Sequence, residues 1–209
     1  TPMESAWRDS RIARIYEGTN EINRLVTIGM LIKKGIKGEL DLMQKAEEVA
    51  NELTEIPSFD VPDFEDLFDE EKYVLNNLKK VFLMLSGAGL KKYGMNLENH
   101  QEVLLSISDI LIEIYMSESA ILRTEKNCKR FGTDNYHAQI AISKLYLFEA
   151  CEMIISKSRE LIFSLSEGSE QKFLLMGLKR FTKYYNYPKP IELKRTIAKI
   201  VSEENRYNL

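Results

Sequence analysis

The sequence has few of the residues that build disulfide frameworks or metal centres. Its 209 residues include two cysteines, Cys128 and Cys151, and two histidines, His100 and His137. Two cysteines in a chain of this length do not form a disulfide framework, and neither has zinc-type spacing to a second ligand. We therefore expect reduced thiols without chemistry of their own, a reducing compartment and no metal site.

An excess of one charge and long apolar runs are also missing. The formal net charge is -3, from 29 basic and 32 acidic residues, so the chain lacks the basic excess of a nucleic-acid-binding protein. No apolar run approaches the ~20 residues that a membrane-spanning helix needs. The first residues, Thr-Pro-Met-Glu, show no signal-peptide pattern and no initiator methionine. We expect a fragment or a processed product, with no nucleic-acid partner.

The periodicity of apolar residues is helical nearly everywhere, and no run alternates with period two. A first helix should run from Thr1 to about Tyr16, and a second from Thr19 or Asn20 to the glycines at 35 and 38. The second should bury one apolar face, which is formed by Ile22, Leu25, Val26, Gly29 and Ile32. The residue pattern predicts an all-α fold of antiparallel helices.

An acidic segment interrupts this pattern. Between Glu39 and Glu71 the sequence has thirteen acidic residues and only one basic residue, Lys45. A short helix is expected over 42–54, before the pattern-breaking Pro57 and Pro62. Aromatic and apolar side chains should then pack against a neighbouring element, because disordered tracts are poor in aromatics; they are Phe59, Val61, Phe64, Leu67 and Phe68.

From about Glu70 the helical pattern becomes strong. Turn-like residues at 94–99 and 132–135 separate three long segments, and further helices are expected from Gly168 to about Tyr184 and from Pro190 to about Val201. Three long helices and a split fourth predict an up-and-down bundle. Its core positions are Val74, Leu78, Val81, Leu85, Ala88, Val103, Ile107, Ile110, Ile114, Ile121, Ile140, Leu147, Cys151, Ile154, Ile155, Ile162 and Phe163.

The segment Tyr16-Glu17-Gly18-Thr19 places a carboxylate at a break between two helices, beside a glycine that permits unusual backbone angles. Thr19, Asn20 and Glu21 should expose N–H groups at a helix N-terminus, which favours anions such as phosphate. These residues therefore predict a carboxylate base beside a phosphate-bearing ligand. Turn chemistry alone explains the same residues, with Glu17 merely solvated.

A longer match distinguishes these two interpretations. Residues 8–25 read RDSRIARIYEGTNEINRL and resemble the signature of the acyl-CoA dehydrogenase family. The stretch from Glu39 to Leu209 resembles, more loosely, the additional helical domain of that family's very-long-chain branch. The resemblance implies three parts: the last helices of the catalytic C-terminal domain (1–38), an acidic connector (39–70) and a helical-bundle extension (71–209).

The resemblance also implies an activity, the α,β-dehydrogenation of an acyl-CoA, of long chain, to a trans-2-enoyl-CoA with FAD as cofactor. The position of Glu17 is that of the general base, and its backbone N–H polarises the thioester carbonyl. Thr19, Asn20 and Glu21 lie along FAD, and Tyr16 and Gly18 border the substrate. Electron-transfer flavoprotein is the expected acceptor, and a homodimer the expected assembly. Because the family's other domains supply most of the flavin site, the 209 residues alone are expected to be inactive.

A second interpretation concerns the basic segment from Lys172 to Lys199, which holds eight bases against Glu192. Its interleaved apolar residues make it amphipathic, as in helices that bind a membrane surface or mediate dimerisation. Alternatively, it balances the acidic connector within the molecule. A bacterial cytoplasm is the expected location, with the mitochondrial matrix or the surface of its inner membrane as the alternative.

Overall fold

The computed structural model describes residues 2–55 and 62–204. The described residues form eight α-helices, two short 3₁₀ helices and no strand, which confirms the all-α prediction. In chain order they are α1 (Pro2–Ile12), α2 (Asn20–Ile36), α3 (Leu42–Thr54), α4 (Asp69–Tyr93), η1 (Gly94–Asn99), α5 (Gln101–Phe131), η2 (Thr133–Asn135), α6 (His137–Leu165), α7 (Gly168–Phe181) and α8 (Pro190–Glu204).

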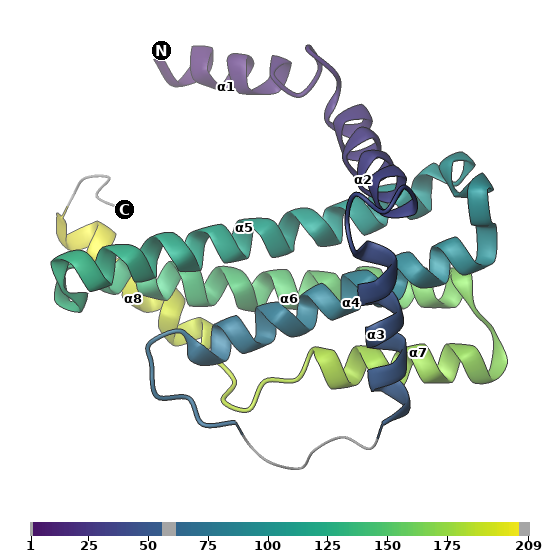
Figure 1. The fold of residues 1–209 in the computed structure, drawn as a ribbon. Helices are drawn as coiled ribbons and strands as arrows, with labels where there is room; N and C mark the ends of the chain where they lie inside the picture. Colours follow the sequence, from purple (N-terminus) through teal and green to yellow (C-terminus); the bar gives the residue numbers. More distant parts are fainter. Residues whose placement is uncertain (1, 56–61, 205–209) are drawn as a thin grey trace.

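The long helices α4, α5 and α6 lie side by side and alternate in direction (Figure 1). The turns η1 and η2 join them, as the turn-like residues predicted. The split fourth position is filled by α7, which packs on α4 and α6, and by α8, which packs on α6. Helix α3 crosses the bundle in front of α4 and α7. Helix α2 lies outside the bundle and contacts it near the start of α5. The up-and-down arrangement therefore follows from helices joined by short connections.

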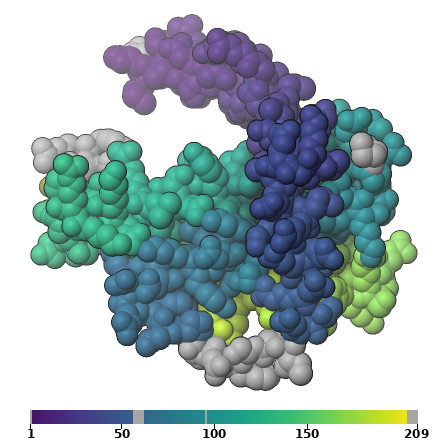
Figure 2. Space-filling view, in the orientation of Figure 1, coloured from purple at the N-terminus to yellow at the C-terminus, as the bar shows by residue number. Residues whose placement is uncertain are grey.

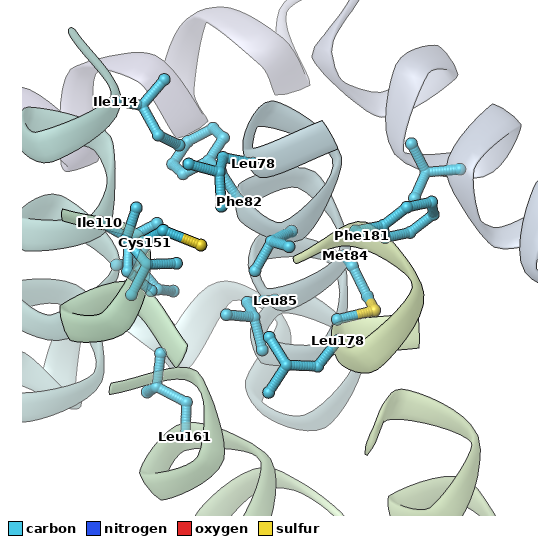
Figure 3. Close-up of a cluster of buried hydrophobic side chains, with 14 of the residues drawn as sticks. Leu78, Phe82, Met84, Leu85, Ile110, Ile114, Cys151, Leu161, Leu178 and Phe181 are labelled. Carbon is cyan, nitrogen blue, oxygen red and sulfur yellow. The ribbon is translucent and has the colours of Figure 1, made fainter. Parts of the chain in front are cut away.

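The core lies where α4, α5, α6 and α7 meet. Figure 3 shows side chains of all four helices converging there, among them Leu85, Ile110, Cys151 and Phe181. The predicted stripes of α4 and α5 are buried, except that Ala88 is only partly so. On α6 the prediction for Phe163 was wrong: this side chain is 58% exposed, because the buried face there turns to Leu161, Ile162 and Leu165.

Both cysteines are free and buried, as expected for thiols without chemistry of their own. Burial raises the pKa of the Cys128 thiol. Burial, with a smaller contribution from the charge of Glu152, raises the pKa of Cys151 to about 12. Because the thiolate is the reactive form, neither residue is an activated nucleophile.

The acidic segment packs on the rest of the molecule through aromatic side chains near its end. Phe68 is fully buried, and Phe64 packs on Tyr73 and Tyr185 with ring centroids 5.9 and 6.0 Å away. This confirms that the aromatic residues of the segment pack on a neighbour, although Phe59 and Val61 lie outside the described residues. The boundaries of α3 coincide with the predicted 42–54.

The connector also contacts the basic segment. Arg180 donates to the Glu52 backbone carbonyl at 2.9 Å, and the Glu70 carboxylate accepts from the backbone N–H groups of Tyr185 and Asn186 at 2.8 and 2.6 Å. The apolar face of α7, formed by Leu174, Leu178 and Phe181, is buried in the bundle. These contacts favour charge balance within the molecule over membrane attachment. No described helix combines the length and apolar character needed to cross a membrane.

The N-terminal helices differ most from expectation. The first helix ends at Ile12, several residues before Tyr16, and none of its residues is buried; Thr1 lies outside the described residues. Helix α2 begins after Thr19 as predicted. Of its predicted face, Leu25, Gly29 and Ile32 are partly buried but Ile22 and Val26 are about half exposed, and the fully buried apolar side chain is that of Ile28. Figure 2 shows α1 projecting from the molecule, with an open gap between it and the surface of α5.

One ionic junction fixes α2 to the bundle. Arg24 of α2 and Lys157 of α6 both contact the carboxylate of Asp109 on α5, at 2.6 and 2.8 Å. Burial acts to raise the pKa of Asp109, but the hydrogen bonds and positive charges of Lys157 and Arg24 outweigh it and lower that pKa below its usual value. The junction therefore needs an ionised Asp109.

Removing a central core side chain tests the bundle. Ile154 is fully buried, so Ile154→Ala should lower the free energy of unfolding by about 2–5 kcal/mol through lost burial and the cavity left behind. Urea denaturation followed by circular dichroism measures this. The matched control is Ile191→Ala on α8, an exposed residue, which should change stability by less than about 0.5 kcal/mol. Equal effects of the two substitutions would contradict the assigned core.

Acidification tests the junction at Asp109. Because its folded pKa lies below the unfolded value of about 3.9, the ionised carboxylate stabilises the fold above that pH, and this contribution is lost as the pH falls through the folded pKa. Asp109→Asn should therefore lower the free energy of unfolding at pH 7. As the pH drops below about 4, the free energies of unfolding of wild type and variant should become more similar. Asp134→Asn, at an exposed site, is the control. A pH-independent difference for Asp109→Asn would contradict the assignment.

Candidate functional site

The predicted site residues occupy the turn between α1 and α2 and the start of α2. Residues 13–18 form this turn, which is closed by the Asn20 N–H bonding to the Arg14 carbonyl at 3.1 Å. Thr19 caps α2: its hydroxyl oxygen accepts the Ile22 N–H at 3.3 Å. The sequence prediction of a helix break followed by a capped helix is therefore correct, and it brings all six site residues together.

Glu17 has an unusual backbone conformation. Its φ of 58° is the only positive φ of a non-glycine residue among the described residues, and Gly18 follows with φ 89°. A side chain in this left-handed region costs about 1–2 kcal/mol, because Cβ crowds the following carbonyl. Strain of this kind persists only where the surroundings hold it, and it clusters at functional sites.

Both reactive groups of Glu17 are available. Its side chain is exposed, and among the described residues its backbone N–H forms no hydrogen bond to a protein acceptor. Tyr16 and Gly18 beside it are exposed as well. The turn therefore presents a carboxylate and an N–H from one residue at the surface, without walls around them.

The start of α2 differs from the expected anion site. The N–H groups of Asn20 and Ile22 are bonded within the chain. A hydrogen bond from its own backbone N–H lowers the pKa of Glu21; this outweighs the effect of burial and is helped by the Thr19 hydroxyl, Arg24 and Arg14. Glu21 thus places a negative charge at this helix N-terminus, where the Asn20 and Ile22 N–H groups already have partners within the chain.

Polar side chains line a small hollow near α2. A surface pocket of about 360 Å³ is lined by Asn20, Glu21, Asn23, Arg24, Thr27, Arg14 and Ile112. Its amide, carboxylate and guanidinium groups can bond hydroxyls and phosphates of a nucleotide-like ligand along one edge. Sequence reasoning assigned no role to Asn23 or Arg14. It also missed the Arg24–Asp109 contact, because Asp109 is 85 positions away from Arg24.

A larger hollow lies elsewhere. A groove of about 920 Å³ between α3, α4 and α7 has mainly apolar walls, among them Leu53, Met84 and Phe173, and shares no residue with the turn. The described residues contain no group of three metal-ligating side chains. The turn before α2 therefore remains the place where the predicted chemistry is concentrated.

The chain resembles known proteins over its whole length. Residues 77–180 match the family described as acyl-CoA dehydrogenase, C-terminal domain. A probable acyl-CoA dehydrogenase of Bacillus subtilis (strain 168) is 35% identical over 99% of this chain. The crystal structure of an acyl-CoA dehydrogenase from Bacillus anthracis, complexed with FAD, superimposes with a TM-score of 0.90 at 36% identity and covers 100% of this chain.

The chain spans about a third of the length of these relatives, namely 34% of each. The agreement of sequence and fold over nearly all 209 residues includes both the turn at Glu17 and the bundle. The chain belongs to the acyl-CoA dehydrogenase family, as its 18-residue signature predicted.

Proposed function

We propose that this chain is the C-terminal third of an FAD-dependent acyl-CoA dehydrogenase and that Glu17 is its catalytic base. The observation that carries the proposal is the turn before α2, where Glu17 has a left-handed backbone and presents both its carboxylate and its N–H. The FAD complex of the Bacillus anthracis relative supports the cofactor. The division into residues 1–38, 39–70 and 71–209 is part of the proposal.

In the proposed reaction the Glu17 carboxylate takes a proton from the α-carbon of the acyl thioester. The β-hydrogen leaves with two electrons as a hydride, for which FAD supplies the acceptor, and the product is a trans-2-enoyl-CoA. The Glu17 N–H donates to the thioester oxygen and stabilises the negative charge that develops there. The same residue thus acts on the substrate from two sides.

The described side chains fit one edge of the cofactor. The Asn20 amide and the Glu21 carboxylate line the small pocket beside the turn, and the Thr19 hydroxyl lies at the start of the same helix. These three residues would hold hydroxyl and amide groups of FAD, while Tyr16 and Gly18 would border the acyl chain. A long-chain substrate is proposed because the bundle resembles the extension of the very-long-chain branch.

Exposed apolar residues support a larger parent molecule. Ile22, Val26 and Met30 form an exposed stripe along α2, and Trp7 of α1 is also exposed. Apolar residues on a helix face normally pack against another element. We propose that the remainder of the dehydrogenase covers this surface, encloses Glu17 and excludes water, which strengthens a carboxylate base.

Further parts of the proposal concern partners and location. Electron-transfer flavoprotein would take the electrons, a homodimer is the proposed assembly, and both Bacillus relatives support a bacterial cytoplasmic setting. A helical interaction module for membrane attachment has less support, because the apolar face of α7 is buried. In the proposed homodimer the exposed stripe of α2 is left to the remainder of the dehydrogenase.

Glu17→Gln in the complete dehydrogenase tests the base. The amide keeps the size of the side chain but cannot accept the α-proton, so kcat for acyl-CoA oxidation should fall by at least about 10²–10⁴-fold. Flavin content, read from the visible spectrum, should stay unchanged. Glu39→Gln, at an exposed glutamate outside the turn, is the matched control and should retain activity. Normal turnover by Glu17→Gln would refute the assignment.

A second prediction concerns the 209-residue chain by itself. Because Glu17 is exposed and the adjoining pocket of about 360 Å³ covers only one edge of a ligand, the purified chain should neither retain FAD nor oxidise acyl-CoA. Dialysis with excess FAD followed by absorbance at flavin wavelengths measures retention. A stoichiometric flavin spectrum would show that the chain already contains the cofactor site.

A further inference from the structure

The side chain of Asn23 makes two contacts with the turn that carries Glu17. Its Nδ2 donates to the Gly18 carbonyl oxygen at 2.9 Å. Its Oδ1 lies so close to the Gly18 α-carbon that a Cβ built on Gly18 would be 2.6 Å from it. The amide of Asn23 therefore both bonds the residue after Glu17 and occupies the space beside it.

No other described side chain is hydrogen-bonded to the backbone of residues 13–18. The remaining bonds of the turn are backbone contacts, such as the one from the Asn20 N–H to the Arg14 carbonyl. Yet Glu17 and Gly18 both have positive φ values, 58° and 89°. Since a left-handed backbone is kept only where contacts hold it, Asn23 is the side chain in a position to do so.

The contact is not needed to complete the helix. Thr19 already caps α2 through the Ile22 N–H, and the Asn23 N–H bonds the Thr19 carbonyl at 2.9 Å. The side-chain bond runs five positions back, to a carbonyl outside the helix. Its effect therefore falls on the turn rather than on the helical ladder.

We propose that Asn23 is a positioning residue that fixes the backbone of Glu17 and Gly18, and through it the directions of the Glu17 carboxylate and N–H. This inference rests on the proposed function, in which both groups act on one thioester. Asn23 reaches the substrate only through Glu17. Its loss should slow the chemical step and leave substrate binding almost unchanged, because misplacement of a reacting group acts on the transition state.

The kinetic test uses the complete dehydrogenase loaded with FAD. Asn23→Leu removes the donor at similar size, and kcat should fall by about 10- to 100-fold, with KM for the acyl-CoA within about twofold. Flavin content and melting temperature should match wild type, because the Asn23 amide, although it also lines the small pocket, is engaged by the Gly18 carbonyl rather than free for a ligand. Asn23→Gln keeps an amide donor and should retain most of the kcat. Asn51→Leu, the same change at an exposed position within α3, should leave kcat unaltered.

A second measurement needs no cofactor. In the isotopically labelled 209-residue chain, ¹⁵N relaxation should give amide order parameters near ~0.85 for Glu17 and Gly18, falling below ~0.6 in Asn23→Leu. Asn51→Leu should leave them unaltered. Unchanged order parameters in Asn23→Leu would overturn the proposal.

The kinetic outcomes separate this inference from the proposed function. If Glu17→Gln abolishes turnover while Asn23→Leu keeps kcat within about twofold, the positioning role fails and the base assignment stands. If Glu17→Gln turns over normally, the proposed function fails. A loss of kcat in Asn23→Leu that parallels a loss of flavin and of melting temperature overturns positioning in favour of a general structural role.

Discussion

The placement of the candidate site depends on one carboxylate, that of Asp109. Helix α2, which carries the turn, contacts the bundle through few fully buried side chains, Ile28 among them. Arg24 and Lys157 converge on Asp109 from two different helices at 2.6 and 2.8 Å. Because these groups are partly buried, removal of Asp109 would leave two cations without their anion away from bulk water, which costs more stability than the loss of an exposed ion pair. This junction fixes the first turns of α2 against the bundle, and so where Glu17 lies relative to it.

Helix α2 has two apolar faces, which explains both a success and a failure of sequence reasoning. The helical period was read correctly, but apolar residues occur nearly all round the helix. The predicted face joined Leu25, Gly29 and Ile32, which are partly buried, to Ile22 and Val26, which are exposed. The helix is in fact turned so that Ile28 faces the bundle. A helix that is apolar on several sides belongs in an interior. The same ambiguity that misdirected the prediction thus agrees with the proposal that the rest of a dehydrogenase covers the exposed face of α2.

Much of the remaining fold could be predicted because local signals agreed. The ends of α3 coincided with the predicted 42–54, and the stripes of Val74, Leu78 and Ile110 are buried where the long helices meet. The six residues of the candidate site were found from a contiguous signature. Contacts between distant positions, such as Arg24 with Asp109, leave no local pattern. The Asn23 contact escaped prediction because it depends on the left-handed backbone at Gly18.

The short turn at residues 13–18 also determines the direction of the helix that precedes it. Helix α1 has 11 residues and no buried side chain, so the turn alone determines its direction. At 1.5 Å per residue the helix is about 16 Å long, and a rotation of about 20° at the turn would move its far end by about 5 Å. A small error in the backbone at Glu17 is therefore magnified along α1. The residues that orient the proposed base also set the course of the chain that leads into it.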